Sequence, residues 1–128
     1  MRPPGDVAAQ LADWASAYGT GGLPDAVAAA AIRCIVDASG GGLAAVDRPG
    51  GAAVRQLAST PGPCTLLGRQ ERLSPAAAAL ANAAAIHALD FDDTCYAGTL
   101  HGTVVVWPAV LASAESVEWI QVDNDVEA

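Results

Sequence analysis

Two imidazoles, three carboxylates and a hydroxyl lie within fifteen residues of one another in the second half of this chain. They belong to the segment His87–Thr94, HALDFDDT, and to His101, seven residues further on. A histidine exchanges protons near neutral pH, a carboxylate orients the ring or accepts the proton, and a threonine hydroxyl can hold a substrate oxygen. This grouping indicates general acid–base chemistry.

The same segment also has a purely structural interpretation. Asp92, Asp93 and Thr94 are residue types that cap helices, and an apolar helical pattern resumes soon after them. His87 is equally suited to a core position in which its ring nitrogens are satisfied by neighbours. Taken without their wider context, these residues leave the catalytic and the structural interpretations open.

Two further chemistries use the same residues. His87, Asp90 and His101 offer atoms that bind metals, but their spacing matches no strong metal motif, so we expect no metal. Asp90–Thr94 resembles the D-x-D-x-T motif of haloacid dehalogenase-type phosphatases, in which the first Asp attacks phosphorus and magnesium is required. That motif ends a buried strand, whereas here it follows an alanine-rich helical pattern. The context disfavours a phosphatase.

Alanine-rich segments with helix start signals must position these residues. Asp6 and the pair Ser74-Pro75 are suited to N-caps and first turns, and three consecutive glycines at 40–42 are expected to end a helix. The strand-like signal is confined to Cys64–Leu67. We therefore expect an all-α fold with at most one short strand-like piece, whose helices cover residues 7–18, 24–38, 52–58, 76–89 and 104–114.

The charge balance excludes several partners. Six arginines, no lysine and fourteen acids give a net charge of −8, which repels nucleic acid and anionic lipid surfaces. No apolar run approaches the roughly eighteen residues that span a bilayer, and the N-terminus lacks a signal-peptide pattern. We expect a cytoplasmic protein with no nucleic acid or membrane partner.

The cysteines and the C-terminal end add two expectations. Cys34, Cys64 and Cys95 form no C-x-x-C pair and are suited to reduced thiols, and Cys95 is expected to be a bystander rather than a nucleophile. Residues 116–128, SVEWIQVDNDVEA, lose the alanine bias and carry four acids. We therefore divide the chain into a helical body, 1–115, and an atypical acidic tail, 116–128.

The order of short motifs along the body resembles the opening of the MmgE/PrpD family, which includes 2-methylcitrate dehydratases and cis-aconitate decarboxylases. The resemblance covers about Val7–Glu115. It is most specific in its central stretch. The matching motifs are Leu23-Pro24, Arg33, Val36-Asp37, Gly40, Leu66-Leu67-Gly68, Leu73-Ser74-Pro75, Ala78-Ala79-Leu80-Ala81-Asn82, HALDFDDT, Leu100-His101, Pro108-Ala109 and Ala114-Glu115.

This resemblance implies the N-terminal part of a helical lyase domain that uses no metal or organic cofactor. Asp90, Thr94 and His101 fall on positions that line the family's active site, whereas His87 and Asn82 fall on positions that shape the helix. The family usually continues His-Pro-Ser at His101, and here Gly102-Thr103 follows. The substrate class is a small di- or tricarboxylate, with dehydration of a 2-methylcitrate-like acid first, and cis-aconitate decarboxylation or isomerisation as alternatives.

Family members bring a further histidine, lysines and a second domain from later segments. A chain without lysine has little to balance a tricarboxylate, so we expect this chain to be inactive alone. A non-catalytic helical module that binds itself or a partner is the alternative from another class. The family is commonly dimeric, so we expect a homo-oligomer with the stripes Val27/Ala31/Cys34/Ile35 and Val104/Val105/Leu111 partly buried in it.

Overall fold

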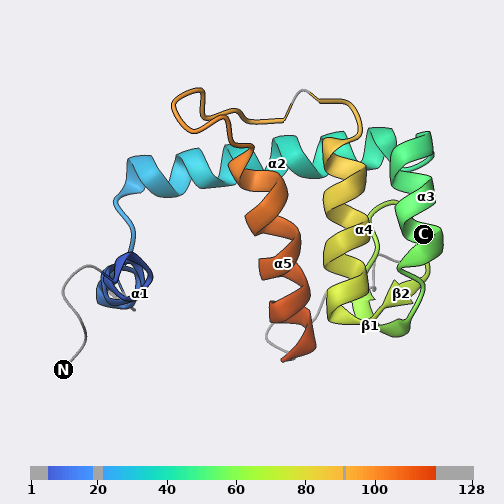
Figure 1. Ribbon diagram of the computed structural model, residues 1–128, viewed down its shortest axis with the longest axis horizontal. Helices are drawn as coiled ribbons and strands as arrows, with labels where there is room; N and C mark the ends of the chain where they lie inside the picture. Colours follow the sequence, from blue (N-terminus) through green and yellow to red (C-terminus); the bar gives the residue numbers. More distant parts are fainter. Residues whose placement is uncertain (1–5, 19–21, 91, 118–128) are drawn as a thin grey trace. The chain divides into compact units, whose positions relative to one another are not determined.

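A computed structural model describes residues 6–18, 22–90 and 92–117 (Figure 1). These residues form five helices and one two-stranded antiparallel sheet, so the predicted helical class is confirmed. Residues 1–32 and 33–128 form separate compact units, and each is described by itself. The elements are α1 (Val7–Tyr18), α2 (Asp25–Ala45), α3 (Pro49–Leu57), β1 (Pro61–Thr65), β2 (Arg72–Leu73), α4 (Pro75–His87) and α5 (Gly102–Ser116).

The first unit contains α1 and the beginning of α2. Asp6 caps α1 as its position predicts, because its Oδ1 accepts a hydrogen bond from the Ala9 backbone N–H at 3.1 Å. Trp14 and Tyr18, one turn apart, contact edge to face with ring centroids 5.0 Å apart. None of the residues of α1 is buried.

Helix α2 continues through the glycines that were expected to end it. Gly41 and Gly42 are buried, and a Cβ on Gly42 would lie 3.0 Å from both Ile86 Cγ1 and Leu67 Cδ1. The glycines therefore allow close packing of the last turns of α2 against α4, and this packing outweighs their poor helix propensity. The prediction of a helix end at residue 38 was wrong because it used local propensity alone.

As a result, α2 is longer than the sequence indicated. By length and composition alone it could span a membrane, contrary to the expectation that no segment is long enough. A single such helix near an N-terminus is weak evidence, since core helices of soluble proteins meet the same criterion. Its C-terminal part is packed within the second unit, where Ala38 is buried with Ile86 and Val104, and where Ser39 Oγ accepts a hydrogen bond from Trp107 Nε1 at 3.1 Å.

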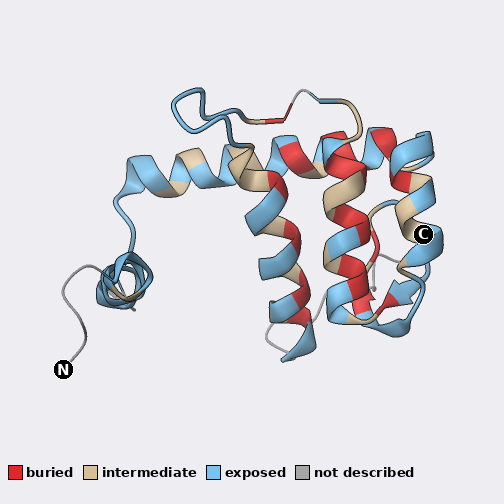
Figure 2. Cartoon of the chain, in the orientation of Figure 1, coloured by how far each residue is buried: buried red, intermediate tan, exposed pale blue. Residues whose placement is uncertain are grey.

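In the second unit, α4 and α5 lie side by side and antiparallel, with α3 on the other side of α4 (Figure 1). The buried residues of α4 are small except for Asn82 and Ile86, which lets neighbouring elements approach it closely (Figure 2). Ser74 precedes α4 and Pro75 takes its first turn, as predicted, although the Ser74 side chain makes no capping hydrogen bond. A main core cluster joins the sheet to both helices through Cys64, Leu66, Leu73, Ala77, Ala78, Ala81 and Ala112.

The two strands form a small hairpin that packs against α4 and α5. The predicted extended piece is shifted toward the N-terminus, and the two-residue strand β2 that pairs with it was not predicted. A Cβ on Gly62 would lie 2.5 Å from Ser74 Cα, so only glycine fits there without a shift of the backbone. The missing side chain therefore lets β1 lie close to Ser74, the residue before α4, whose backbone N–H donates a hydrogen bond to Thr60 O at 2.8 Å.

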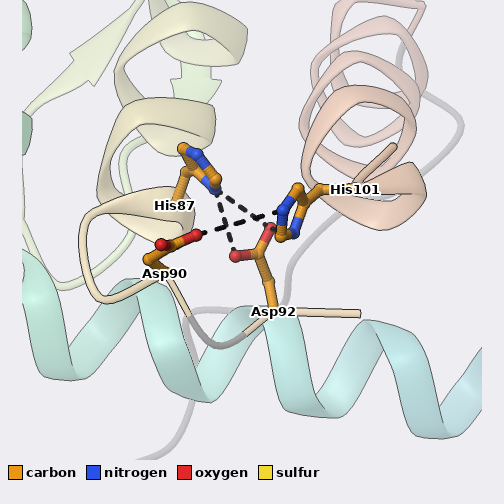
Figure 3. A group of neighbouring side chains, drawn as sticks. All are labelled: His87, Asp90, Asp92 and His101. Carbon is orange, nitrogen blue, oxygen red and sulfur yellow. Dashed lines mark hydrogen bonds and ion pairs between the residues drawn. The ribbon is translucent and has the colours of Figure 1, made fainter. Parts of the chain in front are cut away.

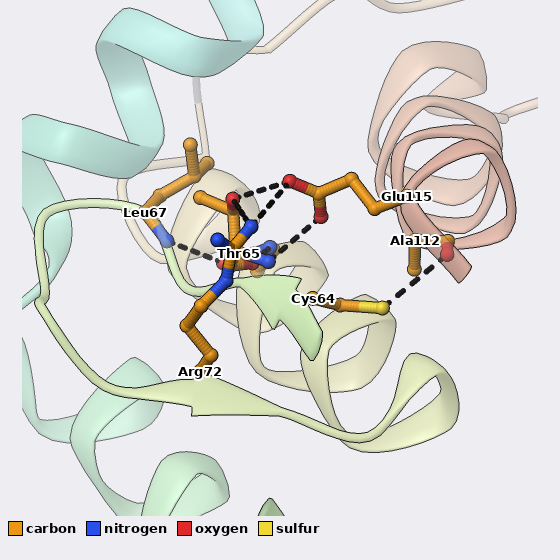
Figure 4. A network of polar contacts seen from close by, with 7 residues as sticks. Cys64, Thr65, Leu67, Arg72, Ala112 and Glu115 are labelled. Atoms are coloured by element: carbon orange, nitrogen blue, oxygen red, sulfur yellow. Dashed lines mark hydrogen bonds and ion pairs between the residues drawn. The ribbon is translucent and has the colours of Figure 1, made fainter. Parts of the chain in front are cut away.

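Buried polar groups connect the hairpin to both helices (Figure 4). Asn82 Oδ1 accepts a hydrogen bond from Leu67 N at 2.9 Å, and its Nδ2 donates to Thr65 O at 2.9 Å. Glu115 of α5 accepts hydrogen bonds from the Thr65 backbone N–H at 2.7 Å and from the Thr65 hydroxyl, and it pairs with Arg72 at 3.2 Å. We call these residues the hairpin network: Thr65, Leu67, Arg72, Asn82 and Glu115.

The predicted acidic tail lies largely outside the described residues. Ser116 ends α5 and Val117 follows it, whereas residues 118–128 are not described. The Ser116 hydroxyl donates a hydrogen bond to Ser113 O at 2.8 Å within the last turn.

Candidate functional site

The antiparallel pairing of α4 and α5 brings the two histidines of the chain together. His87 is the last residue of α4, and His101 occupies the position immediately before α5, so both lie at the same end of the helix pair. Their rings are 4.8 Å apart, centroid to centroid, and meet edge to face. His101 makes no side-chain capping hydrogen bond, which leaves its ring to face the loop that connects the helices.

The Asp92 carboxylate contacts both rings (Figure 3). Its Oδ1 is 3.1 Å from His87 Nδ1, and its Oδ2 is 3.3 Å from His101 Nδ1. The Asp92 side chain is only 3% exposed, whereas that of His87 is 50% exposed. The contact with His101 is within ion-pair distance but lacks hydrogen-bond geometry, so the buried His101 Nδ1 has no hydrogen-bond partner among the described residues.

Asp90 approaches the other nitrogen of the His101 ring. Its Oδ1 lies 3.9 Å from His101 Nε2, and its side chain is 81% exposed. The backbone of Asp90 has φ +53, in the left-handed region, which turns the chain sharply after α4. His101 therefore has one buried and one exposed carboxylate on its two sides.

Thr94 and Asp93 do not join this grouping. The Thr94 hydroxyl donates a hydrogen bond to the Asp92 backbone carbonyl at 3.2 Å, which stabilises the turn at Asp92. The Asp93 carboxylate accepts a hydrogen bond from Thr103 N at 3.1 Å at the start of α5. The capping interpretation therefore holds for Asp93. We call the four residues that do meet the His–Asp cluster: His87, Asp90, Asp92 and His101.

Of the three residues predicted for the site, the structure brings His101 and Asp90 together. The third, Thr94, does not contact His101 in this way; its hydroxyl donates to the backbone carbonyl of Asp92. The sequence did not predict that Asp92 would contact both histidines, or that His87 would belong to the site. A signal was present in the sequence, since a carboxylate five residues after a helix-terminal histidine can fold back onto its ring when the helix ends between them.

The HALDFDDT segment does not have the setting of a phosphatase motif. Asp90 follows the end of helix α4, and the sheet in the described residues consists only of β1 and β2, remote in sequence from Asp90. A nucleophilic Asp of that class needs the end of a buried strand. This finding agrees with the sequence context.

The cysteines are separate from the cluster. Burial raises the pKa of the Cys64 thiol, with the Glu115 carboxylate adding to the rise and the Arg72 guanidinium opposing it. The thiol donates to Ala112 O at 3.3 Å, which is the behaviour of a core residue. Cys95 is exposed, and its backbone pairs with Leu100 across a short loop.

No ion pair joins an arginine to the His–Asp cluster within the described residues. Among the described arginines, Arg69 pairs with Asp47, Arg72 pairs with Glu115, and Arg55 donates to the Val46 carbonyl. An open groove of about 440 Å³ runs beside His87 between α4 and α5, but its lining is almost entirely apolar: Ala79, Leu80, Ala83, Ala84, Val104, Val105 and Ala109. The groove itself therefore cannot neutralise the carboxylates of a substrate.

The cluster can hold and transfer a proton. An imidazole exchanges protons near neutral pH, and a carboxylate beside a ring nitrogen can accept a proton from it. Asp92 is the buried, orienting carboxylate, and Asp90 lies on the exposed side, from which a substrate can approach.

Comparison with family models and with curated proteins identifies relatives of this chain. Residues 9–122 match the MmgE/PrpD N-terminal domain. The chain is 32% identical over 112 residues to a cis-aconitate decarboxylase of Aspergillus terreus, covering 85% of this chain and 23% of that protein. It is 30% identical over 116 residues to the cis-aconitate decarboxylase-like protein oryM of Aspergillus oryzae, covering 88% of this chain and 24% of that protein. No solved structure matches.

The chain therefore belongs to the MmgE/PrpD family, as the order of its motifs indicated. It spans about a quarter of the length of the curated relatives that it matches.

Proposed function

We propose that this chain supplies part of the active site of an MmgE/PrpD-type lyase that acts on a small di- or tricarboxylate, with His101 as the acid–base group. The observation that carries the proposal is the placement of His101, with the Asp92 carboxylate 3.3 Å from one ring nitrogen and the Asp90 carboxylate 3.9 Å from the other. Asp90 and Thr94 orient the ring or the substrate, Thr94 acting through the turn that holds Asp92.

Proton transfer at this position suits two reactions of carboxylic acids. In a decarboxylation, the carbon–carbon bond to one carboxylate breaks, carbon dioxide leaves, and the remaining electron pair takes a proton from the imidazolium. In a dehydration, a base removes the proton next to a carboxylate, and an acid protonates the departing hydroxyl as water. Each reaction needs at least one well-placed group that exchanges a proton near neutral pH.

The names of the relatives suggest which substrate should be tested first. Two relatives are named for cis-aconitate decarboxylation, so cis-aconitate comes first. A 2-methylcitrate-like acid, which the family resemblance put first, is the second substrate, and isomerisation of a related acid is the third. The shared chemistry is a proton exchanged beside a carboxylate.

The chain alone is expected to be inactive. Three aspartates lie in and beside the cluster, and the described contacts of Arg55, Arg69 and Arg72 are all elsewhere. A tricarboxylate near this cluster needs cations that further protein must supply. Proton transfer by itself contributes roughly 10²- to 10⁴-fold in rate, which leaves most of the acceleration to charge stabilisation and positioning.

The test uses a chimera in which this chain replaces the matching quarter of the Aspergillus terreus relative. We expect the chimera to decarboxylate cis-aconitate, and His101→Ala to lower its kcat by roughly 10²- to 10⁴-fold. The isolated 128-residue chain serves as the negative control. Full activity in the His101→Ala chimera, with folding verified by circular dichroism, would contradict the assignment of His101.

Self-association remains a second proposal because large apolar side chains are exposed in the described residues. Val27 and Val105, from the two stripes predicted to pack against another chain, are 49% and 62% exposed. Val104 from the second stripe is instead buried within its own unit, against Ala38 and Ile86. We expect Val105→Glu to shift the sedimentation coefficient of the chain toward that of a monomer, and a wild-type monomer at high concentration would contradict it.

A further inference from the structure

We propose that the His–Asp cluster binds one divalent transition-metal ion of the zinc type, with His87, Asp92 and His101 as the main ligands and Asp90 as the fourth. This site goes beyond the proposed lyase chemistry, which needs no metal. It was not expected from the sequence, because the sequence spacing matches no metal motif and only the fold brings the four residues together.

The spacing of the donor atoms fits a tetrahedral ion. Zinc binds nitrogen and oxygen at about 2.0–2.2 Å, which places neighbouring ligand atoms roughly 3.3–3.5 Å apart. Here His87 Nδ1 is 3.1 Å from Asp92 Oδ1, and His101 Nδ1 is 3.3 Å from Asp92 Oδ2, so the two rings approach different oxygens of one carboxylate. One donor atom from each of the four residues lies within 4.8 Å of the others. Two of the ligand separations are therefore close to the tetrahedral value, and the remaining ones require only small side-chain movements.

The fourth ligand can complete the shell by a small movement. Asp90 is 81% exposed, so its side chain can rotate without disturbing the core. The other three ligands are held more firmly, by the ends of α4 and α5 and by the burial of Asp92. Asp90 is thus the ligand expected to move most on metal binding, while the other three stay close to their present positions.

A second observation points to a missing ligand. His101 Nδ1 is buried and has no hydrogen-bond partner in the described part of the chain. A buried polar atom without a partner is unfavourable, since it has lost its water without gaining a replacement. A metal bound by the lone pair of this nitrogen would satisfy it, and would also balance the buried charge of Asp92.

The donor set determines the kind of ion. Two imidazoles with two carboxylates suit zinc, cobalt, nickel and iron, whereas magnesium and calcium prefer oxygen ligands throughout. Two neutral imidazoles and two carboxylates carry a charge of −2, which a divalent ion neutralises. Zinc and cobalt are therefore the probes of choice, and magnesium is the matched negative control.

Metal binding would oppose the proposed proton chemistry rather than assist it. An ion on His101 occupies the lone pair that would carry the proton and also occupies Asp90 on the substrate side. His87 separates the two functions, since it belongs to the metal site but has no assigned part in the proton transfer. The metal site can accordingly fail without contradicting the lyase proposal, and the reverse also holds.

The experiment measures metal binding to the 128-residue chain. Zinc titration is followed by calorimetry, and cobalt(II) is followed by the visible absorption of a four-coordinate ion. We compare the wild type with His87→Gln and with Asp93→Asn, which removes a carboxylate from the same loop outside the cluster and keeps an acceptor for Thr103. Circular dichroism verifies that each variant is folded.

The expected result is one zinc per chain, four-coordinate cobalt absorption, and no response to magnesium. Loss of a hydrogen-bond partner behind a metal ligand alone lowers affinity roughly 10- to 100-fold, so loss of the His87 ligand should lower it at least that much. Asp93→Asn should bind as the wild type does. The proposal is overturned if the wild type binds no zinc, or if folded His87→Gln binds it unchanged.

Discussion

Asn82 and His87 lie five residues apart in α4, yet they belong to opposite kinds of polar site. Asn82 is 2% exposed, and both its amide oxygen and its amide nitrogen bond to the backbone of the hairpin. His87 is half exposed and belongs to a cluster in which His101 Nδ1 has no hydrogen bond to any residue that the structure describes. A fully paired polar group fixes a fold, whereas an incompletely paired one keeps the capacity to bind.

The buried carboxylates of the two sites differ in the same way. Glu115 is balanced by Arg72, which is always charged, and it accepts hydrogen bonds from Thr65. Asp92 is faced by two imidazoles that are charged only when protonated. Within one pair of helices, the hairpin network is therefore committed to structure and the His–Asp cluster is available for chemistry.

The largest expected effect on stability is in the hairpin network. Asn82→Ala leaves the Leu67 N–H and the Thr65 carbonyl buried without partners, which should lower the free energy of unfolding by roughly 2–4 kcal/mol. Urea denaturation followed by circular dichroism measures this. Gln56→Ala, on the exposed side of α3, is the control and should be nearly neutral. If Asn82→Ala lowers the free energy of unfolding as little as Gln56→Ala does, the hairpin network and the His–Asp cluster do not differ in their contribution to stability.

An intermediate effect is expected beside the cluster, where Asp93 caps α5. Asp93→Ala removes the acceptor of the Thr103 N–H and should destabilise the chain by about 1 kcal/mol. Asp93→Asn retains an oxygen acceptor and should recover most of this loss in the same denaturation experiment. If the asparagine variant is as unstable as the alanine variant, the charge rather than the hydrogen bond is responsible.

The smallest effect on stability is expected within the cluster itself. His87 is half exposed, so His87→Gln should change the free energy of unfolding by less than about 0.5 kcal/mol in the absence of metal. Thermal unfolding in the presence of a chelator measures it. A loss comparable to that of Asn82→Ala would show that the cluster is structural, and would place both sites in the same class.

The helices could be predicted from the sequence because their start signals are local. Asp6 and Pro75 determine where α1 and α4 begin, and both lie where the sequence indicated. The end of α2 could not be predicted, since Gly41 and Gly42 remain helical only because Ile86 and Leu67 lie against them. By its own propensity a glycine favours a helix end, whereas its small size favours close contact between helices. Which of the two applies to Gly42 depends on Ile86, more than forty positions away in the sequence.

The candidate site shows the same division. The residue types within HALDFDDT indicate proton chemistry, and His101 and Asp90 do meet. The central position of Asp92 depends on the antiparallel pairing of α4 and α5 and on the sharp turn at Asp90. The five-residue spacing is a local signal for the His87–Asp92 contact. The helix pairing and the turn have none, because pairing is a long-range property and a left-handed residue that is not glycine is uncommon.

The left-handed backbone of Asp90 has a consequence for anyone who engineers this protein. Glycine adopts that conformation without the cost of roughly 1–2 kcal/mol that other residues carry. A search for stabilising substitutions would therefore favour glycine here and would delete the exposed carboxylate beside His101. Thermostability and chemistry compete at this one position, so a variant library selected for heat resistance should hold residue 90 constant.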